Sequence, residues 1–450
     1  MLNIKIDSRK VVKGDTFVAI RGNTVDGHNY IEQAINNGAV KVICEEGSYD
    51  VETVIVPDTN EYLKEYLVNN YSNCFNDIKF IGVTGTNGKT TTCFLTYQIL
   101  NKLGIKTCYI GTIGCYYDDK KIVLNNTTPD ILELYNLLLD AKEAGCKVVV
   151  MEVSSHSISL ERIKGLKYDV CAFTNLTQDH LDYHKTMENY CLAKVGILDY
   201  LKNNGKMIVN ADDFYSRYFM TDNTLTLGET ATDYKIISYK LFNSYTDIKF
   251  SYNDKEYEIK TNLIGKFNVY NYLTSLSLIH NLGIEISDIF KVTSEIYAPD
   301  GRAEIIKVQN SIAVVDYAHT PDAVSKIIDS FREVTNGKLI TIIGCGGDRD
   351  PKKRPIMGNI ASENSDFVIF TNDNPRTEDE KLIMKDVLQG VKKDNYIVIH
   401  DRKEAIKEGV SMLKDEDTLL ILGKGHEDYQ IIGREKIHLS DKEEVYRNIK

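Results

Sequence analysis

One stretch decides how this chain folds: Phe80-Ile81-Gly82-Val83-Thr84-Gly85-Thr86-Asn87-Gly88-Lys89-Thr90-Thr91-Thr92. An apolar, strand-like run leads into a glycine-rich turn, then into a lysine and three threonines that open a helical pattern. Such a turn directs backbone N–H groups into one cavity, where the helix N-terminus adds positive charge. Lys89 can reach the β- and γ-phosphates, and the Thr90 hydroxyl can bind Mg²⁺. The stretch predicts an ATP site, in a variant form because Val83 replaces the first glycine of the usual template.

The composition is that of a soluble globular protein with more than one domain. The chain has 450 residues, of which 42% are hydrophobic and 26% charged, and this length predicts two or three domains. The net charge of −11 argues against a general binder of nucleic acids or anionic membranes. The opening residues lack the basic-then-apolar pattern of a leader, so we do not expect secretion, and no apolar run approaches the roughly 20 residues of a membrane helix. We expect a cytoplasmic monomer without membrane insertion.

The nine cysteines are scattered, and no C-x-x-C pair occurs among them. Scattered thiols are typical of a reducing compartment and argue against a zinc site or a disulfide framework. We interpret each cysteine as a small buried apolar residue.

Strand and helix signals divide the chain into three α/β segments, 1–75, 76–300 and 301–450. The first holds strands over 17–20 and 40–44 with a helix over 30–35 between them. The second begins with the phosphate loop, and its further expected elements are strands over 147–151, 170–174 and 206–210, antiparallel ribbons over 232–262 and a helix over 265–282. The third alternates helices with strands over 312–315, 339–343, 367–370, 396–399 and 418–422. This alternation predicts a doubly wound sheet.

Polar groups follow two strands of the second segment. Glu152 comes directly after the buried run 148–151, where ligands of open α/β sheets gather. It is a candidate Mg²⁺ ligand or water-positioning base, and pairing with a nearby Lys or Arg is the alternative. The loop 174–184 holds two His, two Asp and an Asn. It is either a ligand cluster or a solvated surface loop, and its position near the phosphate loop favours a function.

Three polar loops follow strands of the third segment. Residues 344–355 combine glycines with four cations, and residues 372–376 carry Arg376, whose guanidinium can bind a carboxylate bidentately. Residues 423–427 add a lysine, a histidine and a glutamate. Loops of this kind at one sheet edge predict a site for an anionic or zwitterionic small substrate.

Taken together, these motifs resemble those of the Mur ligases of peptidoglycan synthesis. The matching stretches run in order over nearly the whole chain: 85–91, 151–156, 175–184, 316–322, 344–355, 373–376 and 423–427. The resemblance implies a small N-terminal α/β domain, a central P-loop ATPase-type domain and a C-terminal Rossmann-like domain. It also implies an ATP-dependent amide ligase of cell wall biogenesis. In that reaction ATP phosphorylates the D-glutamyl carboxylate of UDP-MurNAc-L-Ala-D-Glu, and an amine attacks the acyl phosphate.

The resemblance assigns roles residue by residue. The ATP-binding positions would be Gly85, Thr86, Asn87, Gly88, Lys89, Thr90, Thr91, Asn268, Asn271, Arg302 and Asp316. Two Mg²⁺ ions would be held by Thr90, Glu152, His180 and Lys194, the last carbamylated to N6-carboxylysine. The catalytic set would be Lys89, Glu152, His180, Lys194 and Arg302. The muramoyl-dipeptide and uridine would be bound by Ser8, Thr127, Thr128, Ser154 and Arg162. Judged from the residues alone, Lys194 is a helix-surface lysine.

For the added amino acid, the family pattern Asp-Asn-Pro-Arg goes with meso-diaminopimelate. The matching positions are Arg349, Asp373, Asn374, Arg376, Gly423 and Glu427. Arg376 would bind the distal carboxylate of diaminopimelate, and Glu427 the distal ammonium. L-Lysine lacks that carboxylate and would leave Arg376 unpaired in a desolvated pocket. We therefore expect diaminopimelate rather than lysine.

Two features depart from the family pattern. Ser8 lies close to the N-terminus, where the family has a few tens of residues before it, so we expect a shortened first domain with an altered grip on uridine. Gly196 would loosen the helix that carries Lys194 by about 1 kcal/mol relative to alanine. The alternatives are a ligase that adds lysine or another amino acid, a divergent ligase acting on a modified precursor, and a nucleotide-driven switch protein.

Overall fold

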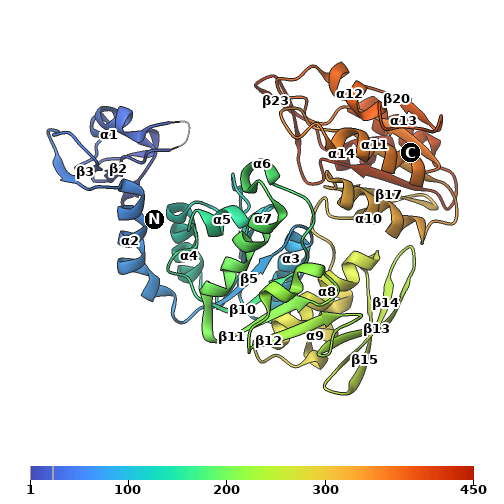
Figure 1. Ribbon diagram of the computed structural model, residues 1–450, viewed down its shortest axis with the longest axis horizontal. Helices are drawn as coiled ribbons and strands as arrows, with labels where there is room; N and C mark the ends of the chain where they lie inside the picture. Colours follow the sequence, from blue (N-terminus) through green and yellow to red (C-terminus); the bar gives the residue numbers. More distant parts are fainter. Residues whose placement is uncertain (1, 23–24, 450) are drawn as a thin grey trace.

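The computed structural model describes residues 2–22 and 25–449. Its strands form three main sheets that follow one another along the chain (Figure 1). The N-terminal part, in blue, and the C-terminal part, in orange and red, lie on opposite sides of the central part. The predicted α/β class is confirmed, whereas the domain limits at residues 75 and 300 stay a prediction.

The N-terminal sheet has four parallel strands in chain order. They are β1 (Ile4–Lys5), β2 (Thr16–Val18), β3 (Lys41–Cys44) and β4 (Glu52–Ile55). Phe17 and Val42 share a small core with Ile31 of α1 (Ile31–Asn36). The predicted strand–helix–strand unit is therefore confirmed, and α2 (Thr59–Tyr71) leads from it to the central part.

The central sheet has 11 strands in the order β15-β14-β13-β12-β11-β10-β5-β9-β6-β7-β8. Its strands are β5 (Lys79–Thr84), β6 (Thr107–Gly111), β7 (Gly114–Tyr117), β8 (Lys120–Ile122), β9 (Val148–Glu152), β10 (Tyr168–Phe173), β11 (Leu201–Asn210), β12 (Thr224–Gly228), β13 (Tyr234–Leu241), β14 (Thr246–Tyr252) and β15 (Lys255–Thr261). The run from β13 to β6 is parallel, and antiparallel ribbons extend it at both ends. The ribbons predicted over 232–262 are thus confirmed as one edge of this sheet.

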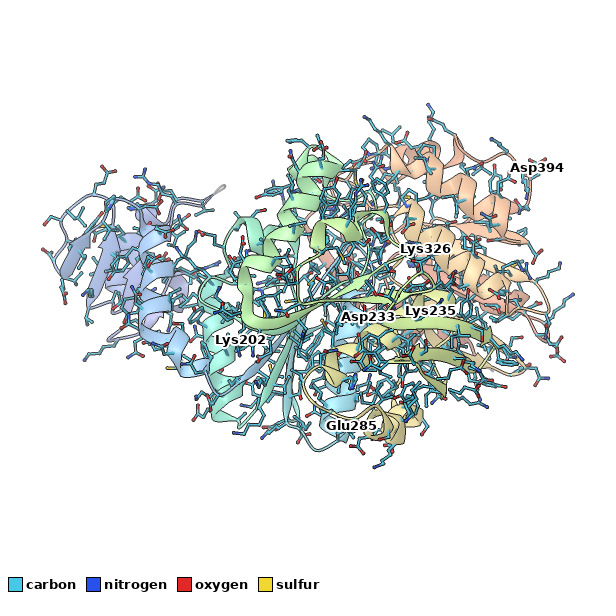
Figure 2. All side chains as sticks on the ribbon, turned by 60° about the horizontal axis from the view of Figure 1, so that its bottom comes forward. Lys202, Asp233, Lys235, Glu285, Lys326 and Asp394 are labelled. Atoms are coloured by element: carbon cyan, nitrogen blue, oxygen red, sulfur yellow. The ribbon has the colours of Figure 1, made fainter. Side chains whose placement is uncertain are left out.

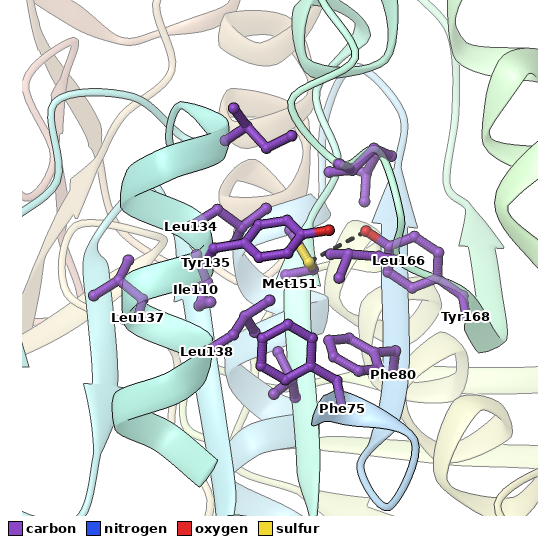
Figure 3. Packing of buried hydrophobic residues seen from close by; sticks show 14 of the residues in the cluster. Phe75, Phe80, Ile110, Leu134, Tyr135, Leu137, Leu138, Met151, Leu166 and Tyr168 are labelled. Carbon is purple, nitrogen blue, oxygen red and sulfur yellow. Dashed lines mark hydrogen bonds between the residues drawn. The ribbon is translucent and has the colours of Figure 1, made fainter. Parts of the chain in front are cut away.

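Hydrophobic cores cover both faces of the central sheet. Alternate residues of β9 enter different cores, since Val149 and Met151 belong to one and Val148 and Val150 to the other. This burial on both faces explains the uninterrupted apolar run in the sequence. In the first core, aromatic rings pack around Met151, whose Sδ accepts a hydrogen bond from the Tyr168 hydroxyl at 3.2 Å (Figure 3).

Helices pack on both faces of the central sheet. They are α3 (Lys89–Lys102), α4 (Ile131–Glu143), α5 (Ser155–Ser159), α6 (Leu181–His184), α7 (Met187–Val195), α8 (Lys266–His280) and α9 (Ile286–Val292). Gly196 lies after the last residue of α7 and opens a 3₁₀ turn with a φ of −54°. The expectation that Gly196 loosens the helix was therefore wrong. A Cβ at Gly196 would come within 2.8 Å of Ile158 Cγ2, so close packing accounts for the glycine.

The C-terminal sheet has six strands in the order β16-β17-β21-β18-β19-β20. They are β16 (Glu304–Val308), β17 (Ser311–Asp316), β18 (Leu339–Ile343), β19 (Phe367–Phe370), β20 (Tyr396–Val398) and β21 (Thr418–Leu422). The accompanying helices are α10 (Pro321–Arg332), α11 (Lys353–Asn364), α12 (Glu380–Leu388), α13 (Arg402–Met412) and α14 (Asp441–Asn448). All five predicted strands are confirmed, and they are parallel to one another.

Sequence reasoning missed the antiparallel edge strand β16 and the hairpin of β22 (Tyr429–Ile432) and β23 (Glu435–His438). Every residue of β23 is exposed, so the strand has no apolar face to reveal it. Charged side chains such as Glu285, Lys326 and Asp394 are exposed on the surface (Figure 2). In the part of the chain that the structure describes, no helix combines the length and apolar character needed to cross a membrane.

Candidate active site

The phosphate loop lies at the carboxyl end of β5, in the interior of the central sheet. Gly85 and Gly88 have φ values of 147° and 86°, a region that favours glycine. A Cβ on Gly85 would also overlap the hydroxyl oxygen of Thr174. The chain then enters α3 at Lys89, so that this helix N-terminus can bind phosphate.

Lys89 is held against its own loop. Its Nζ donates to the carbonyl oxygens of Gly85, at 3.0 Å, and of Thr86, at 2.9 Å. Burial lowers the pKa of Lys89, while the negative charge of Glu152 opposes that shift. Thr90, the next residue, is buried together with Thr91.

Glu152 is the last residue of β9 and is fully buried. Its Oε1 accepts hydrogen bonds from the Tyr109 hydroxyl at 2.7 Å and from the Thr112 amide at 2.8 Å. Its Oε2 accepts from Thr90 Oγ1 at 3.0 Å. Hydroxyl and amide donors therefore hold this carboxylate, and the alternative of a Lys or Arg partner was wrong.

The phosphate loop is bonded to the loop that follows β10. The Asn87 amide donates to Asn175 Oδ1 at 3.0 Å, and Thr86 Oγ1 donates to the carbonyl of Thr177 at 3.2 Å. This half of the 174–184 loop is not a solvated surface segment. His180 is exposed, with a φ of 52°, and its ring centroid lies 5.0 Å from that of His156.

Lys194 also reaches the phosphate loop. Its side chain is 1% exposed, and its Nζ donates to the carbonyl oxygen of Gly85 at 2.7 Å. Nζ also lies 4.6 Å from the ring centroid of Tyr190, one turn earlier on α7. The interpretation of Lys194 as a surface lysine was therefore wrong. Burial, reinforced by the charge of Lys89, sets the pKa of Lys194 well below its ordinary value.

Arg302 brings the C-terminal part to the phosphate loop. Its Nη2 donates to Thr90 Oγ1 at 3.3 Å, and its guanidinium lies 4.6 Å from the ring centroid of Tyr317. The carboxylate of Asp316 accepts from the amides of Ala303 and Ala318, both at 2.7 Å. Asp316 thus orders the turn beside Arg302, and burial raises the pKa of its carboxyl group.

Asn268 and Asn271 lie buried on α8. Asn271 Nδ2 donates to Asn268 Oδ1 at 3.0 Å. A Cβ on Gly88 would come within 2.5 Å of Asn271 Oδ1. Asn271 therefore borders the loop and is bonded to Asn268, and the adenine-side role of the two residues stays a prediction.

Four of the five predicted muramoyl and uridine positions lie together. Thr128 Oγ1 donates to Ser154 Oγ at 3.3 Å, and Arg162 Nη1 donates to the Thr128 carbonyl at 3.0 Å. Thr127 Oγ1 lies 3.1 Å from Thr112 Oγ1, which links this group to Glu152. Ser8 belongs to the N-terminal part instead, where its hydroxyl donates to Gln33.

The loops after β19 and β21 meet at the carboxyl edge of the C-terminal sheet. Asn374 Nδ2 donates to Glu427 Oε2 at 2.9 Å. A Cβ on Gly423 would come within 2.6 Å of Asp373 Oδ2. The structure therefore brings these four predicted positions into one cluster.

The two predicted arginines differ in their surroundings. Arg376 is half-buried and donates from Nη1 to the carbonyl of Gly347 at 2.7 Å, which ties it to the loop after β18. Arg349 is exposed, and its described hydrogen bond goes to the carbonyl of Asp348 beside it. Arg349 is thus not bonded to the cluster.

Two of the four cations in 344–355 support the loops rather than face a substrate. Arg354 is buried and binds the carboxylates of Glu378 and Asp386. Lys353 donates to the carbonyl of His319. Sequence reasoning also missed Lys424, a fully buried lysine bonded to Asn374 and Glu427. Its position between two glycines, in a loop already noted as polar, was the available signal.

The residues near Thr90 suit a magnesium ion in part. The Thr90 hydroxyl and the Glu152 carboxylate supply adjacent oxygen donors, which Mg²⁺ prefers. Over residues 2–22 and 25–449, no three His, Cys, Asp or Glu side chains are grouped to hold a metal. The wider set that includes His180 and Lys194 stays a prediction.

Comparisons with known proteins identify the family of the chain. Three family models match successive parts of the chain: "Mur ligase family, catalytic domain" over residues 2–73, "Mur ligase middle domain" over 83–279 and "Mur ligase, glutamate ligase domain" over 301–425. A solved structure of a UDP-N-acetylmuramoyl-L-alanyl-D-glutamate--2,6-diaminopimelate ligase is similar with a TM-score of 0.70 and 30% identity, covering 99% of this chain and 94% of that one. MurF ligase from Thermotoga maritima, in complex with ADP, shares the fold with a TM-score of 0.73 at 21% identity, covering 100% and 97%.

Curated relatives are similar over the full length. The UDP-N-acetylmuramoyl-L-alanyl-D-glutamate--2,6-diaminopimelate ligase of Clostridium botulinum is 42% identical, covering 99% of this chain and 95% of that protein. The protein of the same name from Aquifex aeolicus is 40% identical, covering 98% and 92%. A phosphate loop, a buried glutamate bonded to Thr90 and an arginine that contacts Thr90 from the segment before β16 accompany these matches, and the chain belongs to the Mur ligase family.

Proposed function

We propose that this protein is an ATP-dependent amide ligase that adds meso-diaminopimelate to the D-glutamate of UDP-MurNAc-L-Ala-D-Glu in peptidoglycan synthesis. The names of its full-length relatives support this reaction. The observation that carries the proposal is the contact of Arg302 with Thr90, which couples the C-terminal part to the phosphate loop. A ligase needs that coupling, because the amine and the activated carboxylate must meet.

ATP would be held by the phosphate loop, with its phosphates at Gly85, Thr86, Asn87, Gly88, Lys89, Thr90 and Thr91. Asn268 and Asn271 would face the adenine side, and Asp316 the ribose. Lys89 and Arg302 would neutralise charge on the transferred phosphoryl group. The hydrogen bonds from Lys89 Nζ to the carbonyl oxygens of Gly85 and Thr86 support this role, since they hold the side chain at the phosphate loop.

Thr90 and Glu152 would hold one Mg²⁺, and His180 and a carbamylated Lys194 would help to hold a second. When bound, the two ions supply positive charge that lets a carboxylate approach a phosphate. Lys194 suits carbamylation because its buried side chain has a pKa far below the ordinary value, and a neutral amine is the form that reacts with CO₂.

In the proposed reaction, an oxygen of the D-glutamyl carboxylate attacks the γ-phosphorus and ADP departs. The amine of diaminopimelate then attacks the acyl phosphate carbon, and the tetrahedral intermediate collapses to an amide and phosphate. The cluster of Thr127, Thr128, Ser154 and Arg162 would orient the muramoyl-dipeptide. Ser8 would contact the uridine part.

Diaminopimelate would be selected by the loops of the C-terminal part. Arg376 would bind its distal carboxylate and Glu427 its distal ammonium, with Asp373, Asn374 and Gly423 shaping the pocket and Arg349 at its rim. We infer that the chain folds as three domains, 1–75, 76–300 and 301–450, which close on the substrates. We also propose that it acts in the cytoplasm as a monomer; its nine free thiols suit a reducing compartment.

The test is phosphate release by the purified protein with ATP, Mg²⁺ and UDP-MurNAc-L-Ala-D-Glu, with meso-diaminopimelate or L-lysine added in parallel. We expect phosphate release when diaminopimelate is added and none when lysine is added. Release with lysine alone would keep the ligase but overturn the role of Arg376. Release that needs neither the dipeptide nor an amino acid would point to a nucleotide-driven switch.

A further inference from the structure

We propose that Lys424 is a positioning residue for the amino acid to be added, acting through Glu427 on recognition of a distal ammonium group. The inference rests on the proposed function, because it needs the pocket formed by Asn374 and Glu427. It extends that function to a residue outside the predicted binding set.

Lys424 is a lysine in an unusual environment. It follows β21 directly after Gly423, and its side chain is fully buried. Burying an ammonium is costly unless the charge is paired and hydrogen-bonded. The partners of the Lys424 ammonium therefore show what the buried charge does.

Its partners are two proposed ligands of the amino acid. Lys424 Nζ donates to Glu427 Oε2 at 3.1 Å and to Asn374 Oδ1 at 3.2 Å. The Tyr429 ring, 5.4 Å away from Nζ to centroid, covers the ammonium on a further side. The positive charge of Lys424 is thus paired with groups of the proposed amino-acid pocket.

The bonds of Lys424 fix the two partners relative to each other. Asn374 Oδ1 accepts from Lys424 and also from the Ile431 amide at 2.9 Å. With its oxygen directed there, the amide nitrogen of Asn374 donates to Glu427 Oε2 at 2.9 Å. One carboxylate oxygen of Glu427 therefore receives two donors from two different loops.

This arrangement preorganises Glu427 before any amino acid binds. Without Lys424, the carboxylate keeps Asn374 as its only donor of this pair, and the glutamate side chain gains rotamer freedom that binding must then remove. The resulting loss of affinity affects ligands that bind to Glu427. In the proposed pocket these are the amino acids with a distal ammonium group.

The experiment compares meso-diaminopimelate with L-2-aminopimelate, which keeps the distal carboxylate but lacks the distal ammonium. Lys424→Met should raise the KM for diaminopimelate at least tenfold while leaving kcat and the KM for ATP nearly unchanged. The inhibition constant of aminopimelate against diaminopimelate should change less than threefold. Lys407→Met, a surface lysine of the same part paired with Glu404, is the matched control and should change neither value.

A double-mutant cycle checks the route through Glu427. Glu427→Gln alone should raise the KM for diaminopimelate. The double variant with Lys424→Met should have a KM no higher than that of Glu427→Gln. Equal losses for both amino acids, or additive losses in the cycle, would overturn the inference while the ligase activity of the wild type stands. Wild-type protein that releases phosphate with neither diaminopimelate nor lysine would overturn the proposed function, and the inference with it.

If Lys424→Met does not fold, Lys424→Arg carries the test. Its longer side chain keeps the charge but displaces the carboxylate, so the same selective loss for diaminopimelate is expected. An unchanged KM in this variant, with the fold intact by thermal unfolding, would contradict the inference.

Discussion

Arg302 Nη2 donates a hydrogen bond to Thr90 Oγ1 at 3.3 Å, although 212 positions separate the two residues in the chain. The Thr90 hydroxyl in turn donates a hydrogen bond to Glu152 Oε2 at 3.0 Å. The guanidinium, the hydroxyl and the carboxylate thus form one line from the C-terminal part to the end of β9. This line joins the part proposed to bind the amino acid to the part proposed to bind ATP.

Arg302→Lys should lower kcat for ligation by about 100-fold, because lysine keeps the charge but loses the planar donors that reach Thr90. Steady-state ADP release measures the effect. Arg332→Lys, on a half-buried arginine paired with Asp366, is the control and should ligate as wild type does. An unchanged kcat in Arg302→Lys would show that the contact with Thr90 has no part in the reaction.

Gly85→Ala should abolish measurable ADP binding, since the new Cβ would overlap Thr174 and the φ of 147° disfavours any side chain. Calorimetric titration with ADP and Mg²⁺ measures this. Gly104→Ala has a similarly unfavourable φ of 78° but open space around the Cβ, so it should cost about 1 kcal/mol of stability without changing ADP binding. Normal ADP affinity in Gly85→Ala would argue against a phosphate site in this loop.

Lys194→Ala should reduce ligation by more than about 100-fold without unfolding the protein, because the proposed carbamate oxygens disappear. Added formate or acetate should restore part of the activity by supplying a carboxylate. Lys185→Ala, at an exposed lysine just before α7, is the control. Full activity in Lys194→Ala would contradict the carbamate proposal.

His184 should make stability depend on pH below neutrality. Burial lowers its pKa from 6.5 to about 4, and its Nε2 lies 2.9 Å from Ser155 Oγ. The unfolded chain takes up this proton more readily than the folded one. The contribution of His184 to the free energy of unfolding is therefore complete above pH 6.5 and falls as the pH drops toward 4. The loss reaches roughly 3 kcal/mol at pH 4.

Thermal unfolding midpoints from pH 7.5 to 4.5 check the effect of His184. His184→Asn should be less stable than wild type at pH 7.5 and should lose less stability on acidification. Parallel curves for wild type and His184→Asn would rule out this contribution.

The sequence predicted the site residues whose position depends only on their place next to a strand in the chain. The phosphate loop and the Asp373–Arg376 turn follow strands, and Glu152 is the last residue of β9, so their place at a sheet edge could be read from position alone. Lys194 and Lys424 could not be placed in this way. Whether a lysine on a helix or in a loop is buried depends on which distant segment packs over it, as Gly85 and Asn374 do here.

The most direct measurement follows oxygen from the D-glutamyl carboxylate. UDP-MurNAc-L-Ala-D-Glu labelled with ¹⁸O in that carboxylate is turned over with ATP, Mg²⁺ and meso-diaminopimelate, and the released phosphate is analysed by mass spectrometry. An acyl-phosphate ligase predicts one ¹⁸O atom in each phosphate released. Phosphate without label would contradict carboxylate activation and, with it, the proposed reaction.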